Sequence, residues 1–320
     1  MGEKDTKAKE YLSDNSRFAD LCNYVLFQGE QIIKAETLIE KDSTEVLSIL
    51  VDGREEQFQK WRDLIKGTVI KRNKDMVFVL IGIENQSDIH YAMPVKNMIY
   101  DALNYGSQVK ETARRHRKNH DKLTPAEFLS GFRKKDKLTP VITITLYWGA
   151  DKWDGPRTLH DMLEHSDETL IKFIPDYHIN LVVPEEIDDF KKFRTTLGEV
   201  LEAIKVSNDK EQMRQLIFSN PAFQKMDNES VAAINTFLGT NIPLNKNEEV
   251  TDMCKAWDDL MNEGIEKGIE KGIKKGIEKG RINIIADFLL NGGTEEQAKE
   301  MLKASENEVT SAKELLTVKI

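Results

Sequence analysis

Three residues in the N-terminal half of the chain, Asp63, Glu84 and Gln86, have types and a spacing that suit metal-assisted chemistry on a phosphate. Glu84 and Gln86 close an apolar run that begins at residue 76, and they are two positions apart, so a β-strand directs both to one face. A carboxylate at the end of an apolar strand is costly to bury unless it is paired, hydrogen-bonded or bound to a metal. Hard oxygen ligands of this kind suit Mg²⁺ or Mn²⁺.

A predicted β-hairpin brings these side chains together. Residues 64–70 and 76–84 are rich in strand-forming residues, and the polar residues 71–75 between them have the length of a turn. Asp63 begins the partner strand, so pairing places it beside Glu84. A metal held there would lower the pKa of bound water and neutralise charge on a phosphodiester under attack. The residues alone leave two other interpretations open: Asp63 as a strand-end cap, and the Glu-x-Gln pattern as a common coincidence.

The remaining pattern predicts an α/β core followed by helices. Ser16 is a candidate N-cap for an amphipathic first helix over residues 18–26, and Pro94 suits the first turn of another helix. Residues 46–50 fit a short strand or a helix end, and 141–148 and 179–183 fit strands. Further helices are predicted at 190–204, 209–239 and 247–262. The order of these elements predicts an α/β fold with an α-helical C-terminal region.

We expect four segments: a domain over residues 1–205, a helical region over 206–262, a repeat over 263–281 and a small helical tail over 282–320. In the repeat, glycine recurs every four residues from Gly264 to Gly280, each followed by isoleucine or, at the end, arginine. Five glycines weaken a helix, so the repeat fits either a linker or a helix covered by another helix, and it is a candidate contact in a homodimer. Capping boxes at Thr294 and Ser305 predict tail helices, which form either a docked module or a helix-turn-helix.

The charge distribution points to one basic segment in an acidic chain. The net charge is −9, yet residues 110–137 hold ten Lys and Arg against four Asp and Glu. The segment fits either a solvated helix and loop or a patch that binds a polyanion such as DNA. His116 and His120, four apart in this segment, could bind a metal, but we interpret them as part of the patch.

Cysteine content and hydropathy indicate a soluble, cytoplasmic protein. The two cysteines, Cys22 and Cys254, are far apart, as expected of free thiols in a reducing compartment. Residues 1–17 are polar, and the longest strongly apolar run, residues 76–83, is far below the roughly 18 residues of a membrane helix.

Several segments together resemble one bacterial protein family. They are Arg17–Asn23, Trp61-Arg62-Asp63, Gly82–Gln86, His90–Val95, Tyr100–Tyr105 and the glycine repeat. The chain resembles the Rpn family of recombination-promoting nucleases, also called PD-(D/E)XK nuclease family transposases, over most of residues 16–205 and the repeat.

This resemblance implies a restriction-endonuclease-like PD-(D/E)XK core, in which helices flank a mixed central sheet. It implies a Mg²⁺-dependent DNA endonuclease acting in recombination or mobile-element biology, with Asp63 and Glu84 as metal ligands. Gln86 falls where many relatives carry a catalytic lysine, and an amide cannot act as a base or carry positive charge. Asp20 is a candidate for a metal-bound water, and the candidate DNA-binding residues are Lys96, Arg114, Arg115, Arg117 and Lys118. The alternative is a catalytically weak DNA-binding or self-associating protein that retains the fold.

Overall fold

The computed structural model describes residues 2–41, 44–51, 54–61, 63–72, 75–164, 167–245 and 248–318. The chain divides into two compact units, Met1–Cys254 and Lys255–Ile320, which are described separately. No helix within the described ranges is both long and apolar enough to cross a membrane.

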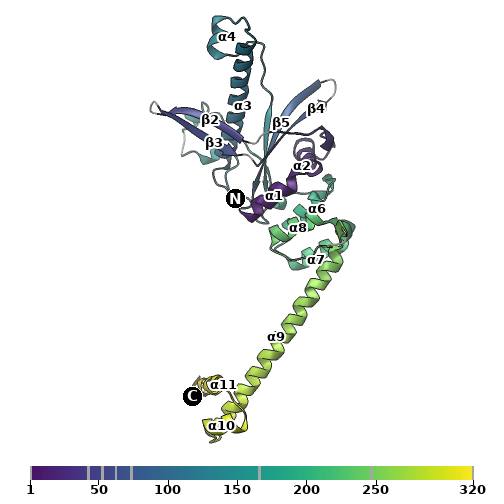
Figure 1. Ribbon diagram of the computed structural model, residues 1–320, viewed down its shortest axis with the longest axis vertical. Helices are drawn as coiled ribbons and strands as arrows, with labels where there is room; N and C mark the ends of the chain where they lie inside the picture. The colour runs from purple at the N-terminus through teal and green to yellow at the C-terminus, as the bar shows by residue number, and fades with distance from the viewer. Residues whose placement is uncertain are drawn as a thin grey trace. The chain divides into compact units, whose positions relative to one another are not determined.

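The first unit is built on a five-stranded mixed sheet with the order β1-β4-β5-β6-β7 (Figure 1). The pairs β1–β4 and β4–β5 are antiparallel, whereas the pairs β5–β6 and β6–β7 are parallel. The strands are β1 (Ile39–Glu40), β4 (Leu64–Arg72), β5 (Asp75–Gln86), β6 (Val141–Tyr147) and β7 (Asn180–Val182). The predicted hairpin and the strands at 141–148 and 179–183 are therefore confirmed. The predicted turn at 71–75 includes residues 73 and 74, which lie outside the described residues.

Two further antiparallel pairs accompany the sheet. β2 (Thr44–Val51) pairs with β3 (Arg54–Trp61), which makes the segment at 46–50 a strand. The two-residue strands β8 (Met226–Asp227) and β9 (Val250–Thr251) form the other pair. These last two strands lie in a region where only helices were expected.

The first unit contains α-helices of very different lengths. They are α1 (Glu3–Ser13), α2 (Asn15–Phe27), α3 (Met93–Lys118), α4 (Pro125–Ser130), α5 (Glu168–Ile171), α6 (Leu197–Lys205), α7 (Lys210–Ser219) and α8 (Asn228–Leu238). Short 3₁₀ turns occur at Ala35–Thr37, His160–Met162, Pro184–Glu186, Phe190–Lys192 and Pro221–Lys225.

Side-chain contacts assign the helices to the two faces. On one face, Asn97 of α3 donates to Thr145 Oγ1 of β6 at 2.8 Å, and Thr143 donates to Asp101 at 2.6 Å. On the other face, Lys66 of β4 donates to the Ser13 carbonyl at 2.5 Å. Because side chains alternate along a strand, α3 covers one face of the sheet and the α1–α2 pair covers the other.

The helices predicted from sequence differ from the observed ones at their ends. Asp14, rather than Ser16, caps α2, and its carboxylate accepts from the backbone N–H groups of Ser16 and Arg17 at 3.0 Å. The helix predicted at 190–204 begins only at Leu197. The one predicted at 209–239 is divided at Pro221, because proline cannot donate the backbone hydrogen bond of a continuing helix.

The second unit contains α9 (Met253–Leu290) from residue 255 onward, α10 (Glu295–Met301) and α11 (Glu306–Val318). The glycine repeat is helical, within α9. Both tail capping boxes are confirmed: Thr294 pairs with Gln297, and Ser305 pairs with Glu308. The end of α9 docks on α10 and α11 through a small buried core of Ile285, Ala286, Ala298, Ala304, Val309 and Ala312.

Candidate functional site

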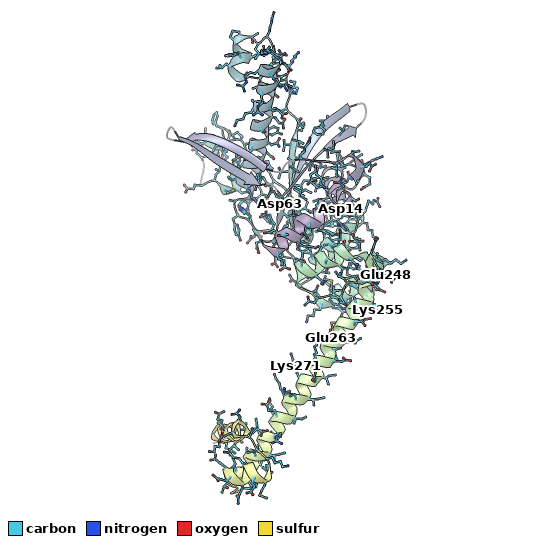
Figure 2. The ribbon with its side chains drawn as sticks, in the orientation of Figure 1. Asp14, Asp63, Glu248, Lys255, Glu263 and Lys271 are labelled. Carbon is cyan, nitrogen blue, oxygen red and sulfur yellow. The ribbon has the colours of Figure 1, made fainter. Side chains whose placement is uncertain are left out.

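The β4–β5 pairing brings Asp63 and Glu84 to the same end of the sheet. Leu64 pairs with Ile83, so Asp63, directly before β4, lies beside Glu84. Asp63 Oδ2 accepts a hydrogen bond from the backbone N–H of Asn85 at 2.8 Å, which fixes the carboxylate against β5. Figure 2 labels Asp63 at this end of the hairpin. The structure thus places the two acids together as the hairpin predicts.

Glu84 is almost completely buried and forms an ion pair with a helix. Its side chain is 1% exposed, and its Oε2 lies 3.0 Å from Nζ of Lys96 in α3. Lys96 is 24% exposed, so its charge lies between the buried carboxylate and the surface. The first turn of α3 therefore supplies a positive charge beside the acid, while the neighbouring Asn97 anchors α3 to β6.

Asp63 and Lys96 also line a cavity of about 310 Å³ at the end of β5. Its lining consists of Asp5, Asp63, Asn85, Gln86, Ser87, Asp88, Ile89, His90 and Lys96. Gln86 donates through Nε2 to the Asn85 carbonyl at 2.7 Å, so the amide is held along its own strand. The cavity presents carboxylates and amides together with one ammonium group, a set suited to a hydrated cation and a phosphate.

Asp5, from α1, is a cavity residue that the sequence did not identify. Its Oδ1 accepts a hydrogen bond from the Ser87 hydroxyl at 2.9 Å, directly after β5. α1 was not predicted because few of its residues are apolar; Ala8, Tyr11 and Leu12 are its buried side chains. The spacing of these three was the only sequence signal for a helix that reaches the cavity.

Burial dominates the electrostatics of Asp63. It raises the pKa of the Asp63 carboxyl, and the negative charge of Asp5 acts in the same direction. The Asn85 N–H and the positive charges of Lys96 and Lys9 oppose that rise in pKa without cancelling it. The surroundings of Asp63 therefore disfavour its ionised form relative to a carboxyl in water, and a positive charge nearby would favour that form.

Carboxylate and amide oxygens are donors that a hydrated magnesium ion prefers. The described residues contain no group of three His, Cys, Asp or Glu side chains arranged to hold a metal. Mg²⁺, however, is commonly bound by one or two carboxylates together with several waters and a substrate phosphate. Asp63 supplies one such carboxylate in the cavity wall, and Glu84 lies beside it.

The structure does not bring Asp20 to this cavity. Asp20 is 2% exposed, and its carboxylate accepts from the backbone N–H groups of Arg194 and Thr195 at 2.8–2.9 Å and from the Thr195 hydroxyl at 2.7 Å. These bonds hold the segment before α6 against α2. The metal-water role suggested for Asp20 is replaced by a structural one, and Asp5 is the α-helical acid at the cavity.

Four candidate DNA-binding residues lie at the C-terminal end of α3. This basic cluster consists of Arg114, Arg115, Arg117 and Lys118, all of them exposed. A surface groove of about 590 Å³ is lined by Arg114, Arg115 and Lys118 together with Lys110. Lys96 is separated from this cluster by some five turns of α3 and belongs to the cavity.

His116 is a structural residue within the same helix end. It is 5% exposed, and its two ring nitrogens lie 2.6 Å from carboxylate oxygens of Asp121 and Asp136. Hydrogen bonding of the His116 ring to these two carboxylates raises its pKa. His116 thus engages two of the four acids in the basic segment, while the four side chains of the basic cluster remain exposed.

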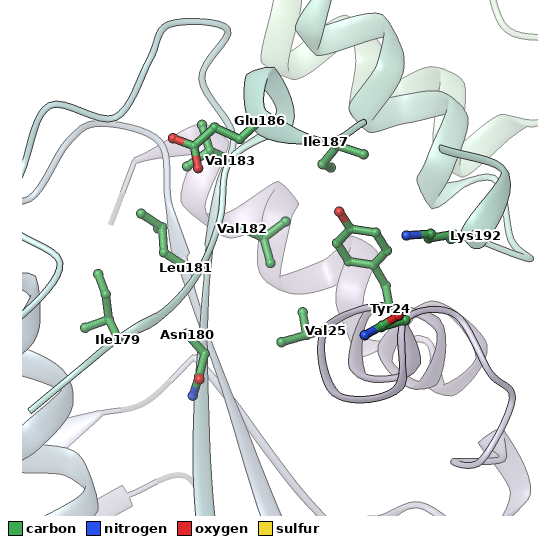
Figure 3. Close-up of a pocket in the computed structure, with 11 residues that line it drawn as sticks. Tyr24, Val25, Ile179, Asn180, Leu181, Val182, Val183, Glu186, Ile187 and Lys192 are labelled. Atoms are coloured by element: carbon green, nitrogen blue, oxygen red, sulfur yellow. The ribbon is translucent and has the colours of Figure 1, made fainter. Parts of the chain in front are cut away.

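A separate cavity of about 440 Å³ lies between α2 and β7 (Figure 3). Tyr24 and Val25 of α2 line it opposite Val182 of β7. Among its lining residues, Glu186 is the one carboxylate and Lys192 the one cation. This lining does not offer the paired acids that phosphodiester chemistry requires.

Comparison with known proteins gives one family. A family model described as "Putative transposase, YhgA-like" matches residues 59–230, more than half of the 320-residue chain. The match includes Asp63, Glu84, Gln86 and Lys96. Comparisons with curated proteins and with solved structures give no match.

Proposed function

We propose that this chain, which belongs to the YhgA-like transposase family of the PD-(D/E)XK Rpn-like group, is a Mg²⁺-dependent DNA endonuclease. The observation that carries the proposal is the pairing of Asp63 with Glu84 at the end of the β4–β5 hairpin, beside Lys96. The mixed five-stranded sheet between helices is consistent with a PD-(D/E)XK core. The family itself connects the chain to mobile-element nucleases.

In this proposal Asp63 and Glu84 hold the metal ion, Mg²⁺ or Mn²⁺. When bound, the metal activates water and stabilises negative charge on the phosphate. Asp63 is oriented for this by the Asn85 N–H at 2.8 Å. Burial raises the pKa of the Asp63 carboxyl, and a cation bound nearby would favour its ionised form.

Lys96 supplies the positive charge that Gln86 cannot supply. The ammonium lies 3.0 Å from Glu84 and lines the cavity, so it can contact both the acid and a phosphate entering the cavity. Gln86, held along β5, can orient a water or a phosphate oxygen by hydrogen bonding. Asp5, which lines the same cavity from α1, would accept hydrogen bonds from water there.

DNA binding is assigned to the basic cluster on α3. Its four exposed side chains lie on the helix that also carries Lys96, so one rigid element connects phosphate binding with the cavity. Electrostatic contacts of this kind position a duplex without reading its sequence.

A second candidate function is a DNA-binding protein with weak catalysis. Two observations favour it: Lys96 neutralises a prospective metal ligand, and the described residues contain no three-acid cluster. Metal-dependent cleavage distinguishes the two functions directly.

The test is nicking of supercoiled plasmid by the full chain in Mg²⁺, Mn²⁺ or EDTA. We compare the wild type with Asp63→Asn, Glu84→Gln and the matched control Asp258→Asn, an exposed acid in α9. The proposal expects metal-dependent nicking by the wild type and the control, with a loss of at least about 100-fold in the two site variants. Equal nicking by all four proteins refutes the site. Shifted but uncut DNA in a gel retardation assay supports the second candidate.

A further inference from the structure

The repeat segment of α9 exposes a row of isoleucines that no described part of the chain covers. Ile265, Ile269, Ile273 and Ile277 are 55–61% exposed. At the five repeat glycines, an added Cβ would meet nothing within 4 Å among the described residues. Alanine would therefore fit at each glycine and would favour the helix more, so contacts within the chain do not explain the glycines.

The repeat arranges four residue types in four parallel rows along α9. Successive residues of a helix are 100° apart around its axis. The order of the rows around α9 is therefore lysine, glycine, isoleucine and glutamate. Each row shifts by about 40° per four residues, because the helix repeats every 3.6 residues. A partner helix that packs along these rows would therefore cross α9 at an angle. When ridges of residues four apart interlock on both helices, the angle between the helix axes is about −50°.

We propose that this face binds the same face of a second copy of the chain, with the two α9 helices parallel. In a parallel pair related by a two-fold axis, the isoleucine side of the contact face on one helix lies against the glycine side of that face on the other. The isoleucine row of one helix then packs onto the glycine row of the other, where the missing side chains leave room. In an antiparallel pair, isoleucines would meet isoleucines, and glycines would meet glycines across a gap.

The charges flanking this face favour the same arrangement. The parallel pair brings the lysine row of one helix, Lys267 to Lys279, toward the glutamate row of the other. That second row is Glu266, Glu270, Lys274 and Glu278, acidic at three of its four positions. An antiparallel pair would oppose lysine to lysine, and a lone helix leaves like charges four residues apart. Charge complementarity therefore selects a parallel second copy as the occupant.

Sedimentation of the full chain tests the pairing and does not depend on nuclease activity. The inference expects a concentration-dependent dimer in the wild type. Replacing the four repeat isoleucines by glutamine should weaken the dimer at least about tenfold, because apolar area no longer becomes buried. The matched control is Ile284→Gln, which removes an isoleucine 60% exposed on the same helix outside the repeat. A monomeric wild type, or equal dimerisation by the fourfold variant, overturns the proposal.

Spin labels determine the direction of the pair. In a Cys254→Ser background that leaves the buried Cys22 in place, a single label at Asn262→Cys lies ten residues before Gly272. A parallel crossing centred on Gly272 separates the two backbone positions by about 15 Å, whereas an antiparallel one separates them by about 30 Å. The short distance supports the proposal and the long one overturns it. Circular dichroism of the fourfold variant verifies that loss of pairing does not reflect unfolding of the first unit.

Discussion

Replacing Lys96 by methionine should destabilise the first unit by leaving the Glu84 charge poorly compensated. Methionine keeps much of the apolar stem of lysine and removes the ammonium group that lies 3.0 Å from Glu84 Oε2. At an effective dielectric constant near 20, two unit charges at that distance attract by about 5 kcal/mol. Desolvation and the 24% exposure of Lys96 reduce the net effect. We therefore expect a loss of about 3 kcal/mol, the lower end for breaking a buried pair.

The assay is thermal and urea unfolding at pH 7, followed by a probe of the first unit. For a unit of this size, a loss of about 3 kcal/mol lowers Tm by roughly 6–12 °C. The matched control is Lys152→Met. Lys152 is 81% exposed and lies 3.5 Å from Glu185, so its loss should cost less than about 1 kcal/mol.

A double variant separates charge from packing. Lys96→Met combined with Glu84→Gln removes both charges and should recover most of the stability lost by Lys96→Met alone. The reasoning is refuted if Lys96→Met costs less than about 1 kcal/mol, or if the double variant is no more stable than the single one.

Three further predictions address charge and pH. Asp63→Asn should abolish cleavage yet raise Tm near pH 7. Burial raises the folded-state pKa of Asp63, so the ionised carboxylate destabilises the folded state above that pKa. The gain in Tm of the variant should therefore vanish as the pH falls below 3.8, the ordinary pKa of an aspartic acid, and a gain that is constant with pH would contradict this. His116 should protect residues 119–137 from hydrogen exchange below pH 6.5, with protection lost as the pH rises through its raised pKa, and His116→Gln should show no such pH dependence. Replacing the basic cluster by alanine should lower the slope of log affinity for DNA against log salt by about 3–4, and an unchanged slope would exclude the cluster from DNA contact.

The hairpin and its two acids could be predicted from sequence because their signals are local. Strand-forming runs on either side of a polar turn set the pairing, and alternation then places Glu84 opposite Asp63. The structure adds what depends on distant segments. Lys96 was expected to face a phosphate, and it also pairs with Glu84, a contact that depends on how α3 packs on the sheet.

Asp20 shows why the position of an acid in an apolar helix is a weak predictor of a role at the functional site. Asp20 lies in the most apolar early helix, and burial there is made possible by the backbone N–H groups of residues 194 and 195, over 170 positions away. Asp5 lies in a polar helix with little periodic signal, yet that helix borders the cavity. Arg62, one of the resemblance residues, lies outside the described residues.

The attachment of α1 to α8 has a consequence for the order of events during synthesis. Tyr11 of α1 hydrogen-bonds to Ser230 at 2.7 Å, and Arg17 of α2 pairs with Asp227 at 2.9 Å. A nascent chain that ends before residue 227 lacks both contacts, although Asp63, Glu84 and Lys96 have already been made. α1, which carries Asp5, then keeps its contacts with β4 and the end of β5 but lacks those with α8 until about 130 further residues have been added after Lys96. The first unit therefore stays incomplete until α8 has been synthesised, and chains ending at residue 226 or 254 should differ accordingly in protease resistance of residues 3–27.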